Sequence, residues 1–173
     1  MSSPWEKYPH IWPTKSSFFT FLRGGLRRGL WEKYPPKLEF KNKACSKPLE
    51  GYTGRAKTGA YCALSGEWTG KSKLEVDHVE GNVPLQDWDD VLPFIMHLCG
   101  TEEDFQLVSK EAHKIKSYSE RMGISYEEAV IKKEAIQICK MDEKKWLQEK
   151  GIVPASNTAK RREQVEEYLR KCT

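Results

Sequence analysis

Two short segments predict the β-structure of this chain, and they lie far apart in the sequence. Leu74–Val79 alternates apolar and polar residues, as a half-buried strand does, and Phe105–Val108 predicts a second short strand. A long connection that contains a helical segment separates the two strands, and another helical segment directly follows the second. This order predicts an α+β fold with a helix inserted between its strands.

The N-terminal part predicts one long helix. Thr14 can cap a helix that runs to about Trp31, and its apolar residues recur at helical spacing: Phe18, Phe19, Leu22, Leu26 and Leu30. A kink or break at Gly24–Gly25 is left open, because each glycine costs about 1 kcal/mol relative to alanine inside a helix. Pro35–Pro36 is expected to end this segment, and residues 41–60 are expected to be mostly extended loop.

Further helices are predicted in the connection and after the second strand. In the connection, a helix should begin within Pro84–Asp90 and run to Leu98, with inward residues Trp88, Leu92, Ile95 and Met96. Downstream, capping residues and glycines delimit four helices: Ser109 to Gly123, Ser125 to about Lys140, Asp142 to Gly151, and about Thr158 to Arg170. N- and C-terminal helices would therefore wrap a small central motif.

Length and composition exclude several classes of protein. The 173 residues suffice for one compact domain with appendages or for two small ones. No run of 18 apolar residues is present, and Met1–Pro13 lacks the apolar core of a signal peptide, so neither membrane insertion nor export is expected. The five cysteines form no CxxC pair, which favours an intracellular chain with free thiols.

The net charge of +4 is unevenly distributed along the chain. Residues 14–43 hold eight Lys or Arg and two Glu, whereas residues 44–139 hold eleven basic and sixteen acidic residues. Residues 140–173 are again basic, with nine basic and six acidic residues. Basic arms around an acidic centre suit a nuclease, whose arms bind phosphates and whose centre binds a metal ion; an ordinary solvated surface is the alternative.

Three side chains in this framework suit metal-dependent hydrolysis. Asp77 and His78 end the first strand, and His113 lies on the helix after the second. A carboxylate and an imidazole can hold a divalent metal ion, and a histidine can accept a proton from water. Because adjacent residues on a strand point to opposite faces, Asp77 and His78 can meet at one spot only if the strand end twists or turns.

The segments that carry these residues resemble the HNH, or ββα-metal, nuclease family. They read LEVDHVEGN over residues 74–82 and DFQLVSKEAHKIKS over residues 104–117. The flanking segments RGGLRRGLWEKYP, GYTGRAKTG and ERMGISYEEA resemble phage-encoded members of the family. The resemblance implies a ββα-metal motif, with a basic helical arm at 1–50, the nuclease core at 51–122 and a C-terminal helical region at 123–173.

The resemblance also implies a role for each site residue. His78 would be the general base, and Asp77 and His113 would bind one divalent metal ion, with Mg²⁺ preferred and Mn²⁺ or Ni²⁺ as substitutes. Asp104 stands where the family has an asparagine that holds the catalytic loop, so it is counted with the catalytic residues although aspartate can only accept a hydrogen bond. Asn82 could take over that role from the loop. His97 is expected to be structural.

A second departure concerns the zinc ion that many family members bind through two CxxC pairs. Those positions read Cys62-Ala-Leu-Ser65 and Ser109-Lys-Glu-Ala112, so one cysteine of four remains. A structural zinc ion needs about four ligands, and none is therefore expected here. Apolar packing by Leu64, Trp68 and Val108 would have to fill its space.

Nine cations are candidate contacts for nucleic-acid phosphates, with a solvated surface as the alternative for each. Arg23, Arg27 and Arg28 are favoured because the three glycines among them let a backbone approach closely. The others are Arg55 and Lys57 in a glycine-rich loop, Lys114 and Lys116 near His113, and Arg161 and Arg162 at the start of the last helix.

Together these observations predict a phage-type, homing or similar endonuclease that hydrolyses DNA in the cytoplasm of a bacterial host. The first alternative is a degenerate HNH scaffold that binds DNA or a host protein without cutting, which the lost cysteines and Asp104 motivate. The second is a nuclease that cuts RNA, because no residue pattern distinguishes the two nucleic acids.

Overall fold

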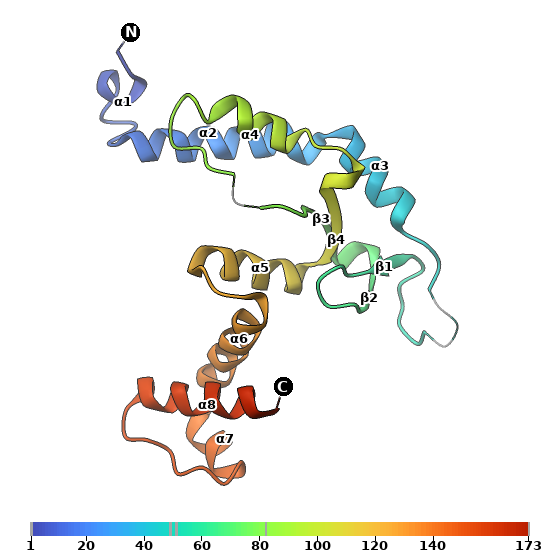
Figure 1. Cartoon of the computed structure of the whole chain (residues 1–173), viewed down its shortest axis with the longest axis vertical. Helices are drawn as coiled ribbons and strands as arrows, with labels where there is room; N and C mark the ends of the chain where they lie inside the picture. Colours follow the sequence, from blue (N-terminus) through green and yellow to red (C-terminus); the bar gives the residue numbers. More distant parts are fainter. Residues whose placement is uncertain (1, 49, 51, 82, 173) are drawn as a thin grey trace. The chain divides into compact units, whose positions relative to one another are not determined.

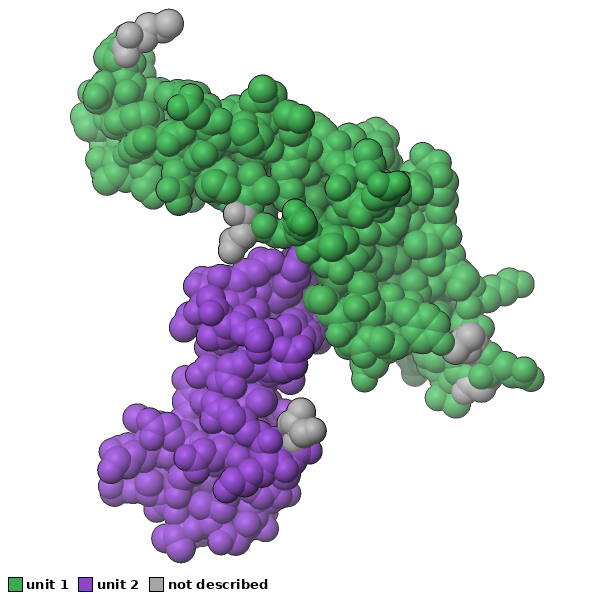
Figure 2. Space-filling model, in the orientation of Figure 1, with its two compact units in different colours: residues 1–110 green, residues 111–173 purple. Residues whose placement is uncertain are grey.

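The structure, a computed structural model, describes residues 2–48, 50, 52–81 and 83–172. It combines helices with two small antiparallel sheets, which confirms the α+β class. The chain divides into two compact units, residues 1–110 and 111–173, and each is described by itself (Figure 2). The expected division at residues 50 and 122 concerns function and stays a prediction.

In the first unit the long N-terminal helix α2 spans Lys15–Gly29 (Figure 1). The Thr14 hydroxyl caps it by accepting a hydrogen bond from the Ser17 amide at 3.1 Å, as predicted. The helix continues through Gly24–Gly25 without a break. Its buried residues Phe18 and Phe19 form a core with Leu85, Phe94 and Leu98, and this packing offsets the cost of the glycines.

The N-terminal helical segment ends before Pro35, as predicted, but the two prolines also begin a helix that was not predicted. Helix α3 spans Pro35–Ala44, with Pro35 and Pro36 in its first turn. A proline at the start of a helix loses no hydrogen bond, because the first amides have no partner within the helix. The expectation of a loop from residue 41 is therefore wrong for residues 41–44.

A two-stranded sheet was missed within residues 59–70. Strand β1, Gly59–Tyr61, pairs antiparallel with β2, Trp68–Gly70. Three-residue strands are too short to show an alternating pattern. Glycine is required at position 59, because a side chain there would clash with the Thr69 carbonyl oxygen.

Helix α4 starts later and faces the core differently than predicted. It spans Val91–Leu98, because Asp90 accepts hydrogen bonds from the Gln86 and Asp87 amides and holds the preceding residues in a turn. Phe94 and Leu98 are buried, whereas the predicted inward residues Leu92 and Met96 are each 65% exposed. The helix is apolar on nearly all sides, so its periodicity could not choose the buried face.

The predicted strands form the second sheet of the first unit. Strand β3, Leu74–His78, pairs antiparallel with β4, Phe105–Ser109, in a register that sets Leu74 opposite Ser109 and His78 opposite Phe105. The buried side chains of this sheet form a second core with Ala60: Leu74, Val76, Phe105 and Leu107. Both strand predictions are confirmed.

The second unit contains the C-terminal helices, which begin and end close to the predicted residues. They are α5, Lys110–Met122; α6, Tyr126–Lys140; α7, Glu143–Glu149; and α8, Thr158–Cys172. Ser125 and Asp142 cap α6 and α7, and the positive φ angles of Gly123 and Gly151 follow α5 and α7. Ala135, Ile138, Leu147 and Val165 form the core of this helical bundle. No helix in the described part of the chain is long and apolar enough to cross a membrane.

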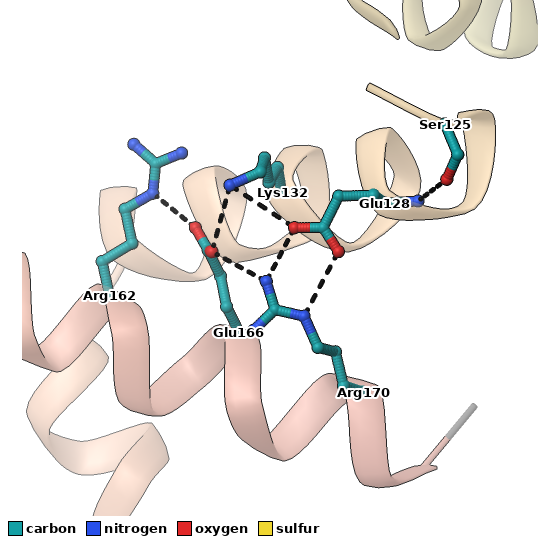
Figure 3. A network of polar contacts seen from close by, with 6 residues as sticks. All are labelled: Ser125, Glu128, Lys132, Arg162, Glu166 and Arg170. Atoms are coloured by element: carbon teal, nitrogen blue, oxygen red, sulfur yellow. Dashed lines mark hydrogen bonds and ion pairs between the residues drawn. The ribbon is translucent and has the colours of Figure 1, made fainter. Parts of the chain in front are cut away.

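Helices α6 and α8 are joined by a network of charged side chains (Figure 3). Arg170 donates two hydrogen bonds to the Glu128 carboxylate, at 2.7 and 3.2 Å. Lys132 bridges Glu128 and Glu166 at 3.4 and 3.5 Å, and Arg162 pairs with Glu166 at 3.0 Å. Hydrogen bonds from Arg170 lower the pKa of Glu128 below its ordinary value.

This network predicts that acid destabilises the second unit. A lowered carboxylate pKa in the fold adds stability that is fully present above the unfolded pKa of about 4.3 and is lost as the pH falls through the folded pKa. We expect the urea midpoint to fall below about pH 4.3, and to fall less steeply in Glu128→Gln. Circular dichroism of α-helix content at several pH values measures this. Glu134→Gln, which changes an exposed residue of the same helix, should keep the wild-type slope; equal slopes in both variants would contradict the prediction.

Candidate active site at the end of strand β3

Asp77 and His78 occupy the last two positions of β3, where their side chains alternate across the sheet. His78 lies on the buried face with Leu74 and Val76 and is 8% exposed, whereas Asp77 is half-buried on the opposite face. The regular alternation continues to the end of the strand, so the two side chains leave it on opposite faces, although the charge of Asp77 still acts on His78 and raises the pKa of its ring.

Gln106 of β4 ties these two residues together across the sheet. It lies opposite Asp77 in the register. Its side-chain amide donates to the Asp77 carboxylate and to the His78 carbonyl oxygen, each at 3.2 Å. Gln106 was not predicted as a site residue, because its role follows from its cross-strand position, which requires the register to be known.

The imidazole of His78 is held between two other rings. Trp31 stacks on it with centroids 4.2 Å apart and planes at 29°, and His97 of α4 lies 3.9 Å away at 30°. Phe105 contacts the ring edge-on at 5.6 Å. The orientation of the ring is thus set by Trp31, which precedes it by 47 positions in the numbering, and by His97, which was expected to be only structural.

The buried position also alters the protonation of His78. Burial, followed by the positive charge of His97, lowers the pKa of His78 to about 4, although the Asp77 carboxylate acts in the opposite direction. The ring is therefore neutral at pH 7. A neutral imidazole is the form that can accept a proton.

Asp104 orders the turn that leads into β4. Its carboxylate accepts hydrogen bonds from the Thr101 amide at 2.7 Å and the Thr101 hydroxyl at 3.0 Å, which lower the pKa of Asp104. Its own carbonyl oxygen accepts from the Val79 amide at 2.9 Å. The side chain thus acts only as an acceptor, and the backbone of Asp104 makes the link to the residue after His78. Asn82, the alternative for this role, lies outside the described residues.

A cavity of about 260 Å³ opens beside the two histidines. His78 and His97 line it together with the carboxylates of Glu80, Glu103 and Asp104. The cavity combines a neutral proton acceptor with acidic groups in one place, and such a combination suits acid–base chemistry.

The predicted metal ligands Asp77 and His113 belong to different units. Asp77 ends β3 in the first, and His113 lies in α5 of the second. A carboxylate oxygen and an imidazole nitrogen are suitable ligand atoms for a divalent cation such as Mg²⁺ or Mn²⁺. No group of three or more His, Cys, Asp or Glu side chains that could hold a metal ion occurs among residues 2–48, 50, 52–81 and 83–172. The metal pair stays a prediction.

The candidate phosphate contacts of the first unit differ in their surroundings. Arg23 lies over the Phe94 ring, 5.0 Å from its centroid, and lines a cavity of about 530 Å³. Arg27, Arg28 and Lys57 are exposed. Arg55 is also exposed and lines a cavity of about 510 Å³ with residues that include Tyr52 and Trp68. These five cations could all reach a ligand from solvent.

In the second unit, several predicted phosphate contacts already have carboxylate partners. Lys116 lies 3.5 Å from Glu120, and Arg162 pairs with Glu166. Arg161 is 7% exposed and binds Glu143 at 2.9 Å. Its burial disfavours phosphate binding and gives it a structural role instead. Lys114 is exposed on α5.

Cys62, the one cysteine at the four positions that bind zinc in the family that the sequence resembles, accepts hydrogen bonds in the fold. Cys62 is 1% exposed, and its sulfur accepts from the Ser65 amide at 3.4 Å and the Ser109 amide at 3.2 Å. Burial raises the pKa of this thiol, but hydrogen bonds from the Ser65 hydroxyl and from nearby amides outweigh it and lower the pKa overall. Cys62 therefore joins the loop after β1 to the end of β4.

Comparisons with protein-family models, with curated proteins and with solved structures gave no match for this chain. These comparisons therefore assign the chain to no family. The residues and contacts described above carry what can be proposed about function.

Proposed function

We propose that this chain is a metal-dependent endonuclease of the HNH type that hydrolyses DNA phosphodiester bonds. The observation that carries the proposal is the arrangement at the end of β3, where one amide of Gln106 holds both Asp77 and the backbone of His78. Strand β4 and a helix with His113 follow in the chain. The same residue types occur in the same order in the family that the sequence resembles.

Each side chain has a distinct role in the proposed reaction. His78 accepts a proton from the water that attacks phosphorus, and Trp31 and His97 keep its ring in one orientation. Asp77 and His113 would hold a divalent cation, Mg²⁺ by preference, which when bound supplies positive charge at the leaving 3′ oxygen. Asp104 orders the turn beside the site. The exposed arginines and lysines of the first unit bind the DNA backbone.

One observation favours the alternative of a scaffold that binds DNA or a host protein without cutting. His78 is only 8% exposed. A general base must reach a water molecule, directly or through one other water. In a nuclease, a water molecule would reach His78 through the cavity that this residue lines. A scaffold that does not cut DNA needs no such path for water.

A plasmid-nicking assay separates these functions. Supercoiled DNA is incubated with the full chain in Mg²⁺, in Mn²⁺ and in EDTA, beside the variant Asp77→Asn. We expect nicking in either metal, none in EDTA, and at least a hundredfold loss in Asp77→Asn, with Glu67→Gln, an exposed residue, as the matched control. A folded wild type that shifts DNA in a gel but nicks it in neither metal would support the scaffold. A parallel assay on RNA tests the other substrate.

Removing the Gln106 amide should lower the nicking rate without unfolding the protein. Groups that orient a metal ligand typically contribute about 10- to 100-fold, and we expect a loss of this size in Gln106→Ala. The free energy of unfolding should fall by only about 1 kcal/mol, the net value of a hydrogen bond. Nicking rates and urea titrations measure the two effects. Gln137→Ala, at an exposed position of α6, is the control, and equal rates in the two variants would refute the role of Gln106.

A further inference from the structure

A basic pocket lies on the surface of the second unit, between α5 and α6. Its volume is about 200 Å³, and its lining residues are His113, Lys114, Ser117, Tyr118, Arg121 and Lys133. His113, Ser117 and Arg121 recur every four residues and therefore share one face of α5. Lys133 comes from α6.

The cations of this pocket are not neutralised by carboxylates. None of the described residues that line the pocket is acidic. Among the ion pairs of the described residues, none includes Lys114, Arg121 or Lys133, whereas other cations of the same unit are paired: Lys116, Lys132, Arg161, Arg162 and Arg170. Three like charges around one pocket repel one another, and a bound anion would relieve that repulsion.

The Tyr118 ring holds two of these cations in place. The Arg121 guanidinium lies 5.5 Å and the Lys133 ammonium 5.0 Å from its centroid. Such contacts are attractive and reduce the freedom of long side chains before a ligand binds. The Ser117 hydroxyl lines the same pocket and can donate a further hydrogen bond.

We propose that this pocket binds a backbone phosphate of duplex DNA, adjacent on the strand to the phosphate that is cut. The inference rests on the proposed function, because it takes the reacting phosphate to lie at His113. Arg121 follows His113 by two helical turns, about 12 Å along α5. One phosphate cannot contact both residues, so the end of the pocket that Arg121 and Lys133 form takes a neighbouring phosphate, and the end at His113 faces the reacting one.

The open form of the pocket favours a phosphate that belongs to a polymer. Lys114, Ser117 and Arg121 are all exposed along α5. A small anion is bound best where the protein encloses it, whereas a phosphodiester must continue into a chain on both sides. Arginine, lysine and hydroxyl groups are the side chains that most often bind DNA phosphates.

The test measures DNA binding separately from cutting. Fluorescence anisotropy of a labelled duplex, with the full chain in EDTA and over a range of salt concentrations, gives the Kd and its salt dependence. In the double variant Arg121→Gln/Lys133→Gln we expect the Kd to rise about tenfold or more, as lost charged hydrogen bonds predict. The slope of log Kd against log salt should fall by about one to two.

Matched variants decide between this pocket and general electrostatics. Lys144→Gln/Lys145→Gln removes two exposed cations of α7 and should leave the slope close to wild type. The charge-conserving Arg121→Lys/Lys133→Arg should restore most of the affinity. Equal slopes in the pocket variant and the wild type, or an equal loss in the α7 control, would overturn the proposal.

The binding and nicking measurements together distinguish a failure of the proposed pocket from a failure of the proposed nuclease function. Pocket-dependent binding by a chain that nicks DNA in no metal would overturn the proposed function and the position next to a cut phosphate, and would leave a DNA-backbone site. Nicking by the wild type together with unchanged binding by the pocket variant would overturn the pocket alone.

Discussion

The variant His78→Phe is expected to fold normally and to lose metal-dependent nicking by about a hundredfold to ten-thousandfold, the usual contribution of a general base. Phenylalanine keeps a flat ring between Trp31 and His97, whose centroids lie 4.2 and 3.9 Å from that of His78. It has no nitrogen that can accept a proton. Initial nicking rates on supercoiled plasmid measure the loss, and thermal melting followed by circular dichroism measures the fold.

His97→Phe is the matched control for this prediction. It also replaces an imidazole of the stack by an apolar ring, but His97 only positions its neighbour in the proposed reaction. We expect its nicking rate to remain within about tenfold of wild type, since its loss removes orientation rather than the proton acceptor. If His97→Phe lost as much activity as His78→Phe, the assignment of the base to His78 would be wrong.

The second large effect concerns Arg161, whose replacement by methionine should destabilise the second unit by about 3–5 kcal/mol. Its guanidinium donates to the Glu143 carboxylate at 3.0 Å and to the carbonyl oxygens of Ala155 and Ser156 at 3.0 and 2.9 Å. Methionine fills similar space but leaves these acceptors, one of them charged, without a donor. Urea unfolding followed by circular dichroism gives the difference in free energy.

Two comparisons make this prediction specific. Arg162→Met changes the next residue of α8, whose side chain is 38% exposed, and should cost less than about 1 kcal/mol, because the buried Glu166 keeps Lys132 and Arg170 as partners. The double variant Arg161→Met/Glu143→Met should recover part of the loss, because it removes the charge that the single variant leaves unpaired. If Arg161→Met lowered the free energy of unfolding no more than Arg162→Met does, the buried contacts of Arg161 would add no stability.

Local patterns in the sequence were sufficient for α2, the C-terminal helices and strands β3 and β4, but not for α3 or for the short sheet of β1 and β2. Capping by Thr14, Ser125 and Asp142 and the glycines that follow two helices depend on residues only a few positions apart. The alternation of apolar and polar residues in β3 likewise predicts which of its side chains are buried, because only one face of the strand is apolar. Such features are predictable because the interacting groups are neighbours along the chain.

The environment of each site residue depended on the tertiary structure. Gln106 contacts Asp77 only through the strand register, and Trp31 reaches His78 only through packing between distant segments. The apolar helix α4 had several faces that could be buried, and the contact with α2 selected one. No local pattern contains these choices, because they minimise the exposed apolar area of the whole unit.

Arg161 shows both what the sequence determined and what only the tertiary structure decided. Its sequence position determined that it lies near the start of a helix, where a cation opposes the helix dipole, and phosphate binding was one explanation of its presence there, with chance as the other. Only the tertiary structure brought Glu143 and two carbonyl oxygens to its guanidinium. The sequence thus determined where the charged side chains and the candidate site residues lie along the helices and strands. The fold decided their partners, because burial and pairing depend on segments that meet only when the chain has packed.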